Sequence, residues 1–555
     1  MNAMRILSAA EMQVCDRVTT ERFAIPSIDL MRAAAGAVAA IAREHFPRAR
    51  RVTVLCGRGN NGGDGMMAAR LLAREGLHVT ALLLGDPGAL KGDAAIAWQE
   101  LTNPRRCSIH IVSSARELDQ HRAELDADLI LDALVGTGFK PPLKGLALAA
   151  LRWIAASRAP ILAIDLPSGW PADASSATGP SRVFPADAVV TFTAPKPAHV
   201  FGMLTRRWHQ PVVVAPIGSP DEAVVSRLPL RWAGSATELT LAPRAAASNK
   251  GNFGHVLVVG GTFGSAGGKA GAPAMTALAA LRAGAGLVTA AVPAPALAVV
   301  AAVAPELMTM PLQATAAGHI AEENIEPHRL ASLMEGKTVL AIGPGLGQSP
   351  ETARFAIGLL SATDLPAVID ADALNILAAR PGLLARLARK GKRTLVLTPH
   401  PGEMARLAKT TTAKVQASRL ETARSFARRN HVTLVLKGAR TLIAHPDGCV
   451  AVNTSGNPAM AKGGSGDLLT GLVAGLLAQY PSDPARAVEA AVYLHGLSAD
   501  LAVRAGDQHT LLATDSFAHL SQAFRFYSRA ANGYVWLQGL PDESSSASSA
   551  DEAYR

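Results

Sequence analysis

The sequence predicts an α/β protein with at least two domains. Its 555 residues exceed the roughly 100–200 residues of a single domain, and 49% of them are hydrophobic, which is enough for more than one core. Short apolar runs with strand character alternate along the chain with segments whose apolar residues have helical spacing. This alternation is typical of βαβ units, in which helices cover both faces of a parallel sheet.

Five apolar runs in the first part of the chain are predicted to be strands. They are RVTVLC (51–56), HVTALLLG (78–85), ADLILDALVG (127–136), APILAIDLPSG (159–169) and ADAVVTFTA (186–194). The segments between them have helical spacing, as in MMAARLLARE after the first run. Because ligands of open parallel sheets bind beyond the carboxyl ends of the strands, a site is expected in the loops that follow these runs.

Six further runs predict a second sheet. They are HVLVVGG (255–261), GLVTAAV (286–292), TVLAIGPG (338–345), PAVIDAD (366–372), TLVLTPH (394–400) and TLVLKG (433–438). Prolines, serines and charged residues replace the periodic pattern between the two sets of runs, and the C-terminal end has low complexity. We therefore predict a first domain at 1–220, a linker at 221–245, a second domain at 246–528 and a disordered tail at 529–555.

Composition argues against nucleic-acid and membrane partners. The formal net charge is +10, but the densest basic runs, at 48–51 and 389–393, are short, and aromatic residues make up only 4% of the chain. Residues 283–305 carry no charge, yet Pro293 and Pro295 interrupt a stretch that is mostly alanine. We interpret that stretch as a buried strand followed by a helix of small residues.

Cysteine usage and the N-terminus are typical of a cytoplasmic protein. The four cysteines, Cys15, Cys56, Cys107 and Cys449, form no C-x-x-C pair, so neither a zinc site nor a disulfide framework is indicated. The N-terminal residues carry charges where a signal peptide needs an apolar core. The sequence leaves the oligomeric state open, and a homo-oligomer is compatible with it.

The loop GRGNNGGDG at 57–65 matches the G-x-G-x-x-G pattern of dinucleotide-binding loops. An ionised Asp64 at the start of the next helix would, however, oppose a pyrophosphate there. Asn60, Asn61 and Asp64 instead suggest polar groups aimed at a neutral or cationic part of a ligand. The alternative is that these three residues only cap the helix, since Asn and Asp are good N-cap residues.

Two more polar loops follow strands of the first sheet. They are DALVGTGFKPP at 132–142 and DLPSG at 165–169. Asp132 and Asp165 stand at strand ends, where they are either simple turn formers or parts of a site. Because the carboxyl ends of parallel strands share one edge of a sheet, we expect these loops to converge with the 57–65 loop in one crevice.

The second part carries a glycine-rich turn, GGSGD at 463–467, just before an apolar helix. Its free amides at the helix N-terminus would bind phosphate, and Asp467 is a candidate general base on a substrate hydroxyl. The alternative for Asp467 is helix capping. Lys437 follows the run TLVLK and can place a point charge on phosphate, while the residues after it allow a close backbone approach.

With these motifs in order, the chain resembles the bifunctional NAD(P)H-hydrate repair enzymes, in which an epimerase domain is fused to an ADP-dependent dehydratase domain. The motifs are GNNGGDG (59–65), DALVGTG (132–138), DLPSG (165–169), GPGLG (343–347), DADALN (370–375), TPHPGEM (398–404), KGART (437–441) and NPAMAKGGSGDLLTG (457–471). The resemblance spans nearly the whole chain apart from the tail. It implies a Rossmann-like three-layer αβα sandwich followed by a ribokinase-like α/β domain.

For the epimerase domain, the resemblance implies a site for hydrated NADH or NADPH, with Asp165 at the reacting ring. The implied substrate-binding residues are Asn60, Asn61, Gly62, Gly63, Asp64, Gly136, Thr137, Gly138, Phe139, Lys140, Pro141, Pro142 and Asp165. It also implies a potassium ion held by Asn61, Asp132 and Ser168, and oxygen ligands suit such a hard cation.

For the dehydratase domain, the resemblance implies phosphorylation of the hydrate hydroxyl by ADP, release of AMP and loss of phosphate, with magnesium present. Asp467 would be catalytic. The implied substrate contacts are Ala272, Gly345, His400 and Asp467, and the implied ADP or AMP contacts are Lys437, Gly438, Ala439, Arg440, Thr441 and Gly466. His400, as a lone histidine, is alternatively structural.

Three residues of the second part stay unassigned. Asp370 and Asp372 either bind magnesium indirectly or only fix their loop. Lys462 departs from the commoner family pattern, and it either strengthens phosphate binding or points to solvent.

Two rival functions remain at this stage. One is a ribokinase-like small-molecule kinase fused to a Rossmann oxidoreductase, and the other is a non-catalytic nucleotide-binding or scaffold protein. Asn61 and Asp64 argue against the first rival. The set of Asp165, His400, Lys437 and Asp467 argues against the second.

Overall fold

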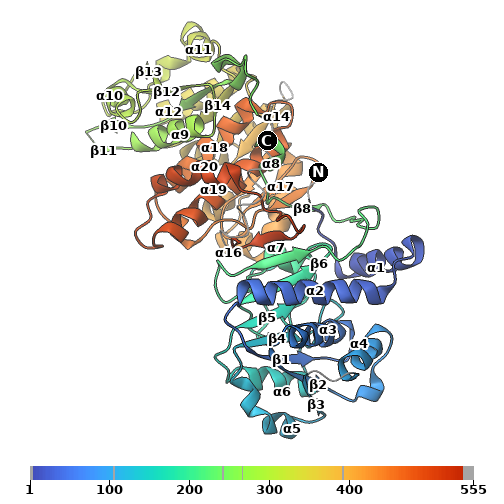
Figure 1. The fold of residues 1–555 in the computed structure, drawn as a ribbon. Coiled ribbons are helices and arrows are strands. Elements are labelled where there is room, and N and C mark those ends of the chain that lie inside the picture. The colour runs from blue at the N-terminus through green and yellow to red at the C-terminus, as the bar shows by residue number, and fades with distance from the viewer. Residues whose placement is uncertain (1–3, 104–106, 241–242, 266, 390–392, 542–555) are drawn as a thin grey trace. The chain divides into compact units, whose positions relative to one another are not determined.

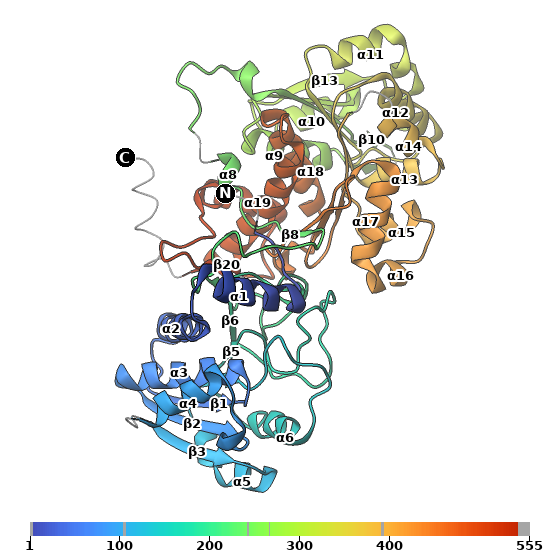
Figure 2. The same cartoon turned by 90° about the vertical axis from the view of Figure 1, so that its right-hand side faces the viewer.

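The computed structural model describes residues 4–103, 107–240, 243–265, 267–389 and 393–541. The chain divides into two compact units, each of which is an α/β fold (Figures 1 and 2). One unit is built from residues 2–228 and from the segment after Ser528, and the other from Pro229–Tyr527. The predicted fold class is therefore confirmed.

The N-terminal unit is organised by an eight-stranded sheet with the order β20-β7-β6-β5-β4-β1-β2-β3. Seven of the strands are parallel, and β20 pairs with β7 in the antiparallel sense. The bounds are β1 Arg51–Cys56, β2 His78–Leu84, β3 Ser108–Val112, β4 Leu129–Ala133, β5 Ile161–Ile164, β6 Ala188–Phe192, β7 Val212–Ala215 and β20 Val535–Gln538. The five predicted strands of the first part are all present.

Helices cover both faces of this sheet, as a three-layer αβα sandwich requires. They are α1 Ala9–Phe23, α2 Ser27–His45, α3 Asn60–Arg74, α4 Asp93–Thr102, α5 Ala115–Gln120, α6 Gly145–Ile154 and α7 Pro197–Phe201, with 3₁₀ turns at Pro87–Ala89 and Arg122–Leu125. Successive residues of β1 point to opposite faces. Val54 joins a core with α2, α3 and α4, whereas Leu55 joins a second core with α5 and α6.

The predicted tail is partly folded, which corrects our expectation for residues 529–555. Strand β20 pairs with β7 through Val535 and Val214, and Trp536 is buried in the sheet core. The four residues VWLQ form this edge strand, and a run with only three apolar residues is too short to predict a strand from sequence. Residues 542–555 lie outside the described residues.

The C-terminal unit is organised by a ten-stranded sheet with the order β13-β12-β9-β14-β15-β16-β17-β18-β19-β8. The first seven strands are parallel, β18 and β19 continue in the antiparallel sense, and β8 is parallel to β19. The bounds are β8 Leu230–Trp232, β9 His255–Val259, β12 Leu287–Pro293, β13 Met308–Leu312, β14 Val339–Ile342, β15 Ala367–Ile369, β16 Leu395–Leu397, β17 Thr433–Leu436, β18 Leu442–Ala444 and β19 Val450–Val452; Phe263–Gly264 (β10) and Gly267–Gly268 (β11) form a separate hairpin.

The predicted linker at 221–245 therefore contains a strand, which corrects that expectation. Arg231 of β8 pairs with Ala451, and Trp232 is buried. The short run LRW between prolines and serines carries too little pattern to be recognised as a strand from sequence.

Helices surround the second sheet. They are α8 Thr237–Thr240, α9 Gly271–Arg282, α10 Leu297–Ala301, α11 Pro327–Met334, α12 Pro350–Ala362, α13 Ala371–Ala378, α14 Leu383–Arg389, α15 Pro401–Leu407, α16 Thr412–Ala417, α17 Arg419–Asn430, α18 Ser465–Gln479, α19 Pro484–Ala505 and α20 Leu520–Arg525, with 3₁₀ turns at Lys250–Phe253, Ala294–Ala296, Glu322–Ile325, Pro458–Met460 and Ala513–His519. Glycines let α18 approach α9 closely, because a Cβ added to Gly471 would lie 2.1 Å from the Thr276 carbonyl oxygen.

The uncharged stretch at 283–305 folds as predicted into a strand and a short helix. Strand β12 pairs with β9 and β13 inside the sheet, and α10 follows it. None of the helices in the described ranges is long and apolar enough to cross a membrane.

Candidate active sites

The loop at 57–59 leads from β1 into α3, and its glycines are required by close packing. A Cβ on Gly57 would lie 1.9 Å from the Leu134 carbonyl oxygen, and one on Gly62 would lie 1.9 Å from the Gly57 carbonyl oxygen. Helix α3 begins at Asn60, its N-cap is Gly59, and no side chain caps it. The interpretation of the polar residues as N-caps is therefore wrong, and their side chains are left for another role.

The three polar loops of the first sheet converge as expected. Strands β1, β4 and β5 are neighbours, so the loops that follow them share one edge. A Cβ added to Gly136 would lie 3.1 Å from Asp165 Oδ2 and 3.2 Å from Asn61 Cγ. The backbone N–H of Thr137 donates to Asp165 Oδ2 at 3.1 Å. Gly136 thus packs closely between Asn61 and Asp165, where even a Cβ would be crowded.

Asp132 and Ser168 form a buried pair beside this space. The Ser168 hydroxyl donates to Asp132 Oδ1 at 2.6 Å, and the Ser168 N–H donates to Oδ2 at 2.7 Å. Burial raises the pKa of Asp132 to about 6, against the opposing effect of these hydrogen bonds. Both polar atoms of the Asn61 side chain are buried and have no hydrogen-bond partner among the described residues. An unpartnered buried amide of this kind marks a place where a ligand or ion is expected.

Asp165 is the most constrained residue of the N-terminal site. It follows β5 with a left-handed φ of 65°, which is costly for a residue with a Cβ. Its Oδ1 accepts from Lys196 Nζ at 2.9 Å and from the Thr191 hydroxyl at 2.9 Å. Burial alone would raise the pKa of Asp165, but the charges of Lys196 and His199 and the hydrogen bonds hold it below the usual value.

The sequence did not reveal that Thr191, Lys196 and His199 belong to this site. Thr191 lies on β6, Lys196 is the N-cap residue of α7, and His199 is in α7. The only signal was their position near the end of the fifth predicted strand, with Thr191 inside it and Lys196 and His199 in the run TAPKPAH (193–199). That run stands at the same sheet edge as the other loops, because β6 is the neighbour of β5.

The surroundings of Asp64 disfavour the charged form of its carboxyl group. Burial raises its pKa well above the usual value, and the nearby Asp165 and Asp16 raise it further. The raised pKa weakens the expected repulsion between Asp64 and a phosphate, because these surroundings disfavour the charged form of the carboxyl group. In its protonated form the group can donate a hydrogen bond.

The segment after Thr137 forms a partly exposed rim of the N-terminal site. Gly138, Lys140, Pro141 and Pro142 are exposed, whereas Phe139 is half-buried and packs against the core under α6. The Phe139 N–H donates to the Gly136 carbonyl oxygen at 3.0 Å, which holds the turn next to Asp165.

In the C-terminal unit, the glycine-rich turn leads directly into α18. Gly464, with a φ of 92°, is the N-cap residue, no side chain caps the helix, and Asp467 lies in its first turn. Capping is therefore not the role of Asp467. Burial and the nearby Asp370 raise the pKa of Asp467, and Lys437 lowers it; the net result is a pKa of about 6.

Lys437 lies at the centre of the C-terminal site. Its Nζ donates to Asp370 Oδ1 at 3.0 Å and lies 4.0 Å from Glu403 Oε2. Burial lowers the pKa of Lys437, but Asp370 and Glu403 outweigh it and the net shift is upward. A Cβ added to Gly466 would lie only 3.2 Å from Nζ, so the lysine charge reaches the glycine-rich turn.

Asp370 has a clear structural role, although the sequence left it unassigned. Its Oδ1 pairs with Lys437 and its Oδ2 accepts from the Thr470 hydroxyl of α18 at 2.9 Å. Asp372 instead fixes its loop, because its carboxylate accepts from the Gly347 N–H at 2.9 Å and from the Gln348 side chain at 2.8 Å.

His400 has a structural role, and its ring is also accessible. Its Nδ1 accepts from the Gly402 N–H at 3.0 Å and caps α15, while Glu403 Oε2 accepts from the His400 N–H at 2.8 Å. About half of the side chain is exposed. Burial lowers the pKa of His400, and Lys437 lowers it further, so the ring is neutral near pH 7.

The remaining predicted contacts fall into two groups. Ala272 and Gly345 lie side by side, because a Cβ added to Gly345 would lie 3.3 Å from the Ala272 Cβ. The segment Gly438–Thr441 turns after β17, with Arg440 at a φ of 57°. The Arg440 side chain is buried and donates to the Thr454 carbonyl oxygen at 3.2 Å, so it anchors this turn from inside.

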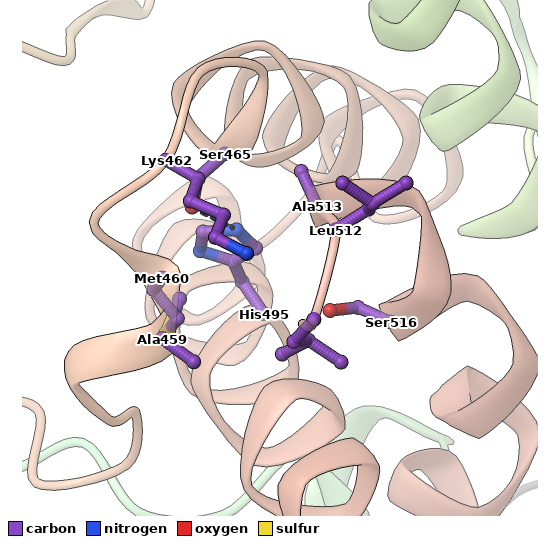
Figure 3. A pocket seen from close by; sticks show the side chains of 9 residues that line it. Ala459, Met460, Lys462, Ser465, His495, Leu512, Ala513 and Ser516 are labelled. Atoms are coloured by element: carbon purple, nitrogen blue, oxygen red, sulfur yellow. Dashed lines mark hydrogen bonds between the residues drawn. The ribbon is translucent and has the colours of Figure 1, made fainter. Parts of the chain in front are cut away.

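Lys462 lies at a small pocket beside the glycine-rich turn (Figure 3). The pocket is also lined by Ser465, His495 and Ser516. Lys462 Nζ donates to the His509 carbonyl oxygen at 2.5 Å. The Lys462 side chain is therefore held by the His509 carbonyl oxygen and does not point freely to solvent. Within the described parts of the chain, no group of three or more His, Cys, Asp or Glu side chains is placed to hold a metal ion.

Comparison with known proteins gives a family match for each unit. Residues 27–198 match the YjeF-related protein N-terminus family, and residues 256–521 match the NAD(P)H-hydrate dehydratase family. A bifunctional NAD(P)H-hydrate repair enzyme of Moorella thermoacetica is 41% identical over 536 residues, which cover 94% of this chain and 97% of that protein. The enzyme of the same name from Escherichia coli is 34% identical over 519 residues, which cover 91% of each chain.

Among solved structures, an ADP/ATP-dependent NAD(P)H-hydrate dehydratase from Bacillus subtilis, co-crystallised with ATP and Mg²⁺, is 32% identical to this chain. The match covers 52% of this chain and 96% of that one, with a TM-score of 0.44.

Proposed function

Because this chain belongs to the family of bifunctional NAD(P)H-hydrate repair enzymes, we propose how its two sites divide that repair. The protein restores NADH and NADPH from their hydrates. The N-terminal unit interconverts the R and S epimers of the hydrate, and the C-terminal unit dehydrates the S form, with ADP converted to AMP and phosphate. The residue roles that follow are our proposal.

In the N-terminal site, Asp165 stabilises the positive charge that develops when the hydroxylated ring carbon loses its hydroxyl group. Ionisation is the property this role needs, and Lys196 holds the Asp165 carboxylate charged. Asp64, whose pKa is raised, gives its proton to the departing hydroxyl group, which leaves as water. Addition of water to either face of the ring, with one proton passing back to Asp64, then gives either epimer.

A potassium ion fits the residues beside Asp165. The amide of Asn61 is buried without a partner among the described residues, and the Asp132 carboxylate and Ser168 hydroxyl lie next to each other. These are oxygen ligands, as a hard cation prefers. The ion would supply positive charge for the substrate's phosphates, and these three residues would hold it.

In the C-terminal site, Asp467 acts as the general base on the hydrate hydroxyl. The hydroxyl oxygen attacks the β-phosphorus of ADP, its proton passes to Asp467, and AMP leaves. Phosphate then departs from the ring carbon as the neighbouring carbon loses a proton, which regenerates the reduced nicotinamide. A base with a pKa of about 6 is largely ionised at neutral pH and still accepts a proton effectively.

We propose that backbone amides and the charge of Lys437 bind the nucleotide. The free amides of the glycine-rich turn and the start of α18 receive phosphate oxygens, and Lys437 places its charge beside Gly466. Magnesium usually binds through one or two carboxylates together with the substrate's phosphates. Asp370 is the nearest candidate for such a carboxylate, and Ala272, Gly345 and His400 would contact the hydrate.

The rival functions fit the sites less well. An oxidoreductase has no need for the buried Lys196–Asp165 pair beside an unpartnered Asn61. A scaffold protein has no need for Asp467, whose charge is disfavoured where it lies. We also propose that the protein works in the cytoplasm on small-molecule substrates.

The observation that carries this proposal is the pair of carboxyl groups, the buried Asp165 and the half-buried Asp467, each at the loop edge of its sheet. The test starts from purified hydrated NADH, which lacks the near-ultraviolet absorption band of reduced nicotinamide. Addition of the full chain and ADP is expected to restore that band and to release AMP. Absence of recovery with both ADP and ATP would contradict the proposal.

A further inference from the structure

We infer that Lys196, supported by Thr191 and His199, is a positioning residue for epimerisation, which fixes Asp165 with one carboxylate oxygen facing the substrate. This inference rests on the proposed role of Asp165. It concerns residues outside the motifs that suggested the function, because Lys196 lies 31 residues beyond Asp165 in the chain.

Lys196 is buried, and two of its three ammonium hydrogens are engaged by the protein. It is 2% exposed, and its Nζ donates to Asp165 Oδ1 at 2.9 Å and to the Thr191 hydroxyl at 2.8 Å. The Thr191 hydroxyl in turn donates to the same Oδ1 at 2.9 Å. A lysine held in this way acts on the reaction through the carboxylate it contacts.

The two oxygens of Asp165 have different surroundings. Oδ1 is engaged by Lys196 and Thr191, whereas Oδ2 accepts only the N–H of Thr137 among the hydrogen bonds described. Gly136 places no side chain against Oδ2, where an added Cβ would lie only 3.1 Å away. The substrate ring is therefore expected on the Oδ2 side, with the lysine on the opposite side.

A second link joins the two residues through the backbone. The Lys196 N–H donates to His199 Nδ1 at 2.9 Å, so the ring hydrogen is on Nε2. Nε2 then donates to the Asp165 carbonyl oxygen at 2.7 Å. This bond supports the left-handed backbone of Asp165, which would otherwise relax and turn the carboxylate away.

Other titratable groups face Asp165 from neighbouring helices. They are Asp16 on α1, Asp64 on α3, and Lys196 and His199 at α7. The pKa values of Asp16 and Asp64 are both raised, that of Asp16 to about 6. Burial lowers the pKa of His199 to about 4. Lys196 is therefore the cation that keeps Asp165 charged among neighbouring acids.

The experiment measures epimer interconversion directly in the full-length protein without ADP. One purified epimer of hydrated NADH is supplied, potassium is in excess, and early formation of the other epimer is followed by chromatography across a range of pH. Wild type is compared with Lys196→Met, Lys196→Arg and Thr191→Val. Lys91→Met, at an exposed lysine of the same unit, is the matched control.

We expect Lys196→Met to move the acid limb of the pH–rate profile upward by about 1–3 pH units, since an opposite charge beside a carboxyl group shifts its pKa by that amount. Lys196→Arg restores most of the wild-type profile. Thr191→Val, which removes one hydrogen bond but no charge, gives a smaller shift in the same direction. The profile of Lys91→Met is unchanged. Asp16→Asn, added to Lys196→Met, leaves the shift in place.

Two results would overturn the inference. One is a Lys196→Met profile with wild-type rates, and the other is a uniform loss at every pH that Lys196→Arg does not restore. Asp165→Asn, measured in parallel, separates this failure from that of the proposed function. If Asp165→Asn itself keeps wild-type rates, the role of Asp165 fails; if only the lysine variants behave like wild type, the role of Lys196 alone fails.

Discussion

Each unit contains a buried lysine–aspartate pair at the loop edge of its sheet, but the two pairs are used differently. In the N-terminal unit, Lys196 lies 2.9 Å from Asp165, the carboxylate proposed to act on the substrate. In the C-terminal unit, Lys437 lies 3.0 Å from Asp370, and the proposed base, Asp467, stands outside the pair. Each lysine thus contacts a carboxyl group with a different place in its site: the proposed reacting group in the first unit, and a neighbour of the proposed base in the second.

The difference in pKa follows from this arrangement. The pKa of Asp165 is held below its usual value, whereas burial and the neighbouring Asp370 raise the pKa of Asp467 to about 6. A group that stabilises positive charge must stay ionised, and a general base works best with a pKa near the working pH. The same two residue types therefore serve two kinds of chemistry because their neighbours differ.

The largest effect is expected for Asp467→Asn. The amide keeps the shape of the side chain but cannot accept the proton, so ADP-dependent recovery of NADH should fall by about 10²- to 10⁴-fold. Nucleotide binding, measured by calorimetry with ADP, should change little, and epimer interconversion should be unaffected. A near-normal dehydration rate in this variant would contradict the role of Asp467 as the general base, and with it the proposed difference between Asp467 and Asp165.

Asp165→Ala is expected to lower the early rate of epimer interconversion by about 10²-fold. Dehydration of the directly usable S epimer should be unchanged, because that chemistry belongs to the C-terminal unit. The early rate is the correct quantity, since uncatalysed epimerisation hides the loss at long times. An early rate equal to that of wild type would return Asp165 to the role of a turn-forming residue.

A smaller effect is expected for Gly466→Ala. The added Cβ would lie 3.2 Å from Lys437 Nζ and displace the charge that meets phosphate, which should raise the KM for ADP by about tenfold. Gly36→Ala in α2 of the N-terminal unit is the matched control, because an added Cβ there meets nothing within 4 Å. Equal KM values in the two variants would contradict the placement of Lys437 at the phosphate site.

The smallest effect concerns His400 and separates its two roles. His400→Ala removes the cap of α15 and should cost about 0.5–2 kcal/mol of unfolding free energy, measured with denaturant. His400→Asn keeps a capping side chain and should retain most of that stability, while it still loses the ring. If both variants bind the hydrate as wild type does, His400 is structural only.

The sequence was sufficient to predict the sheets and the convergence of three loops in the N-terminal unit. Asp132 and Asp165 follow parallel strands, and such strands end at one edge, so their proximity did not depend on side-chain packing. Strands β3, β7, β13, β18 and β19 were not among the predicted runs. The strands β8 and β20 were missed as well, because LRW and VWLQ are short runs in polar surroundings. Only their pairing with β19 and β7 defines them.

Lys196 was missed for a different reason. Lysine is rarely fully buried, so a lysine between prolines in a loop is normally taken as exposed. Its burial depends on Asp165 and Thr191, which three-dimensional packing brings to it. In the same way, the motif containing Asp370 was visible, but only the contacts with Lys437 and Thr470 give that residue a role.

The most direct test of the contrast between the units is the pH dependence of both activities in the same full-length protein, with potassium in excess so that Asp132 stays ionised. Asp467 acts as the ionised base and its pKa is raised to about 6, so kcat/KM for dehydration should rise as pH increases through about 6 and level off above it. Epimerisation should not show this rise, because the pKa of Asp165 is lowered. Dehydration that is independent of pH through this range, or a parallel fall of both activities below it, would contradict the assignment of the two carboxylates.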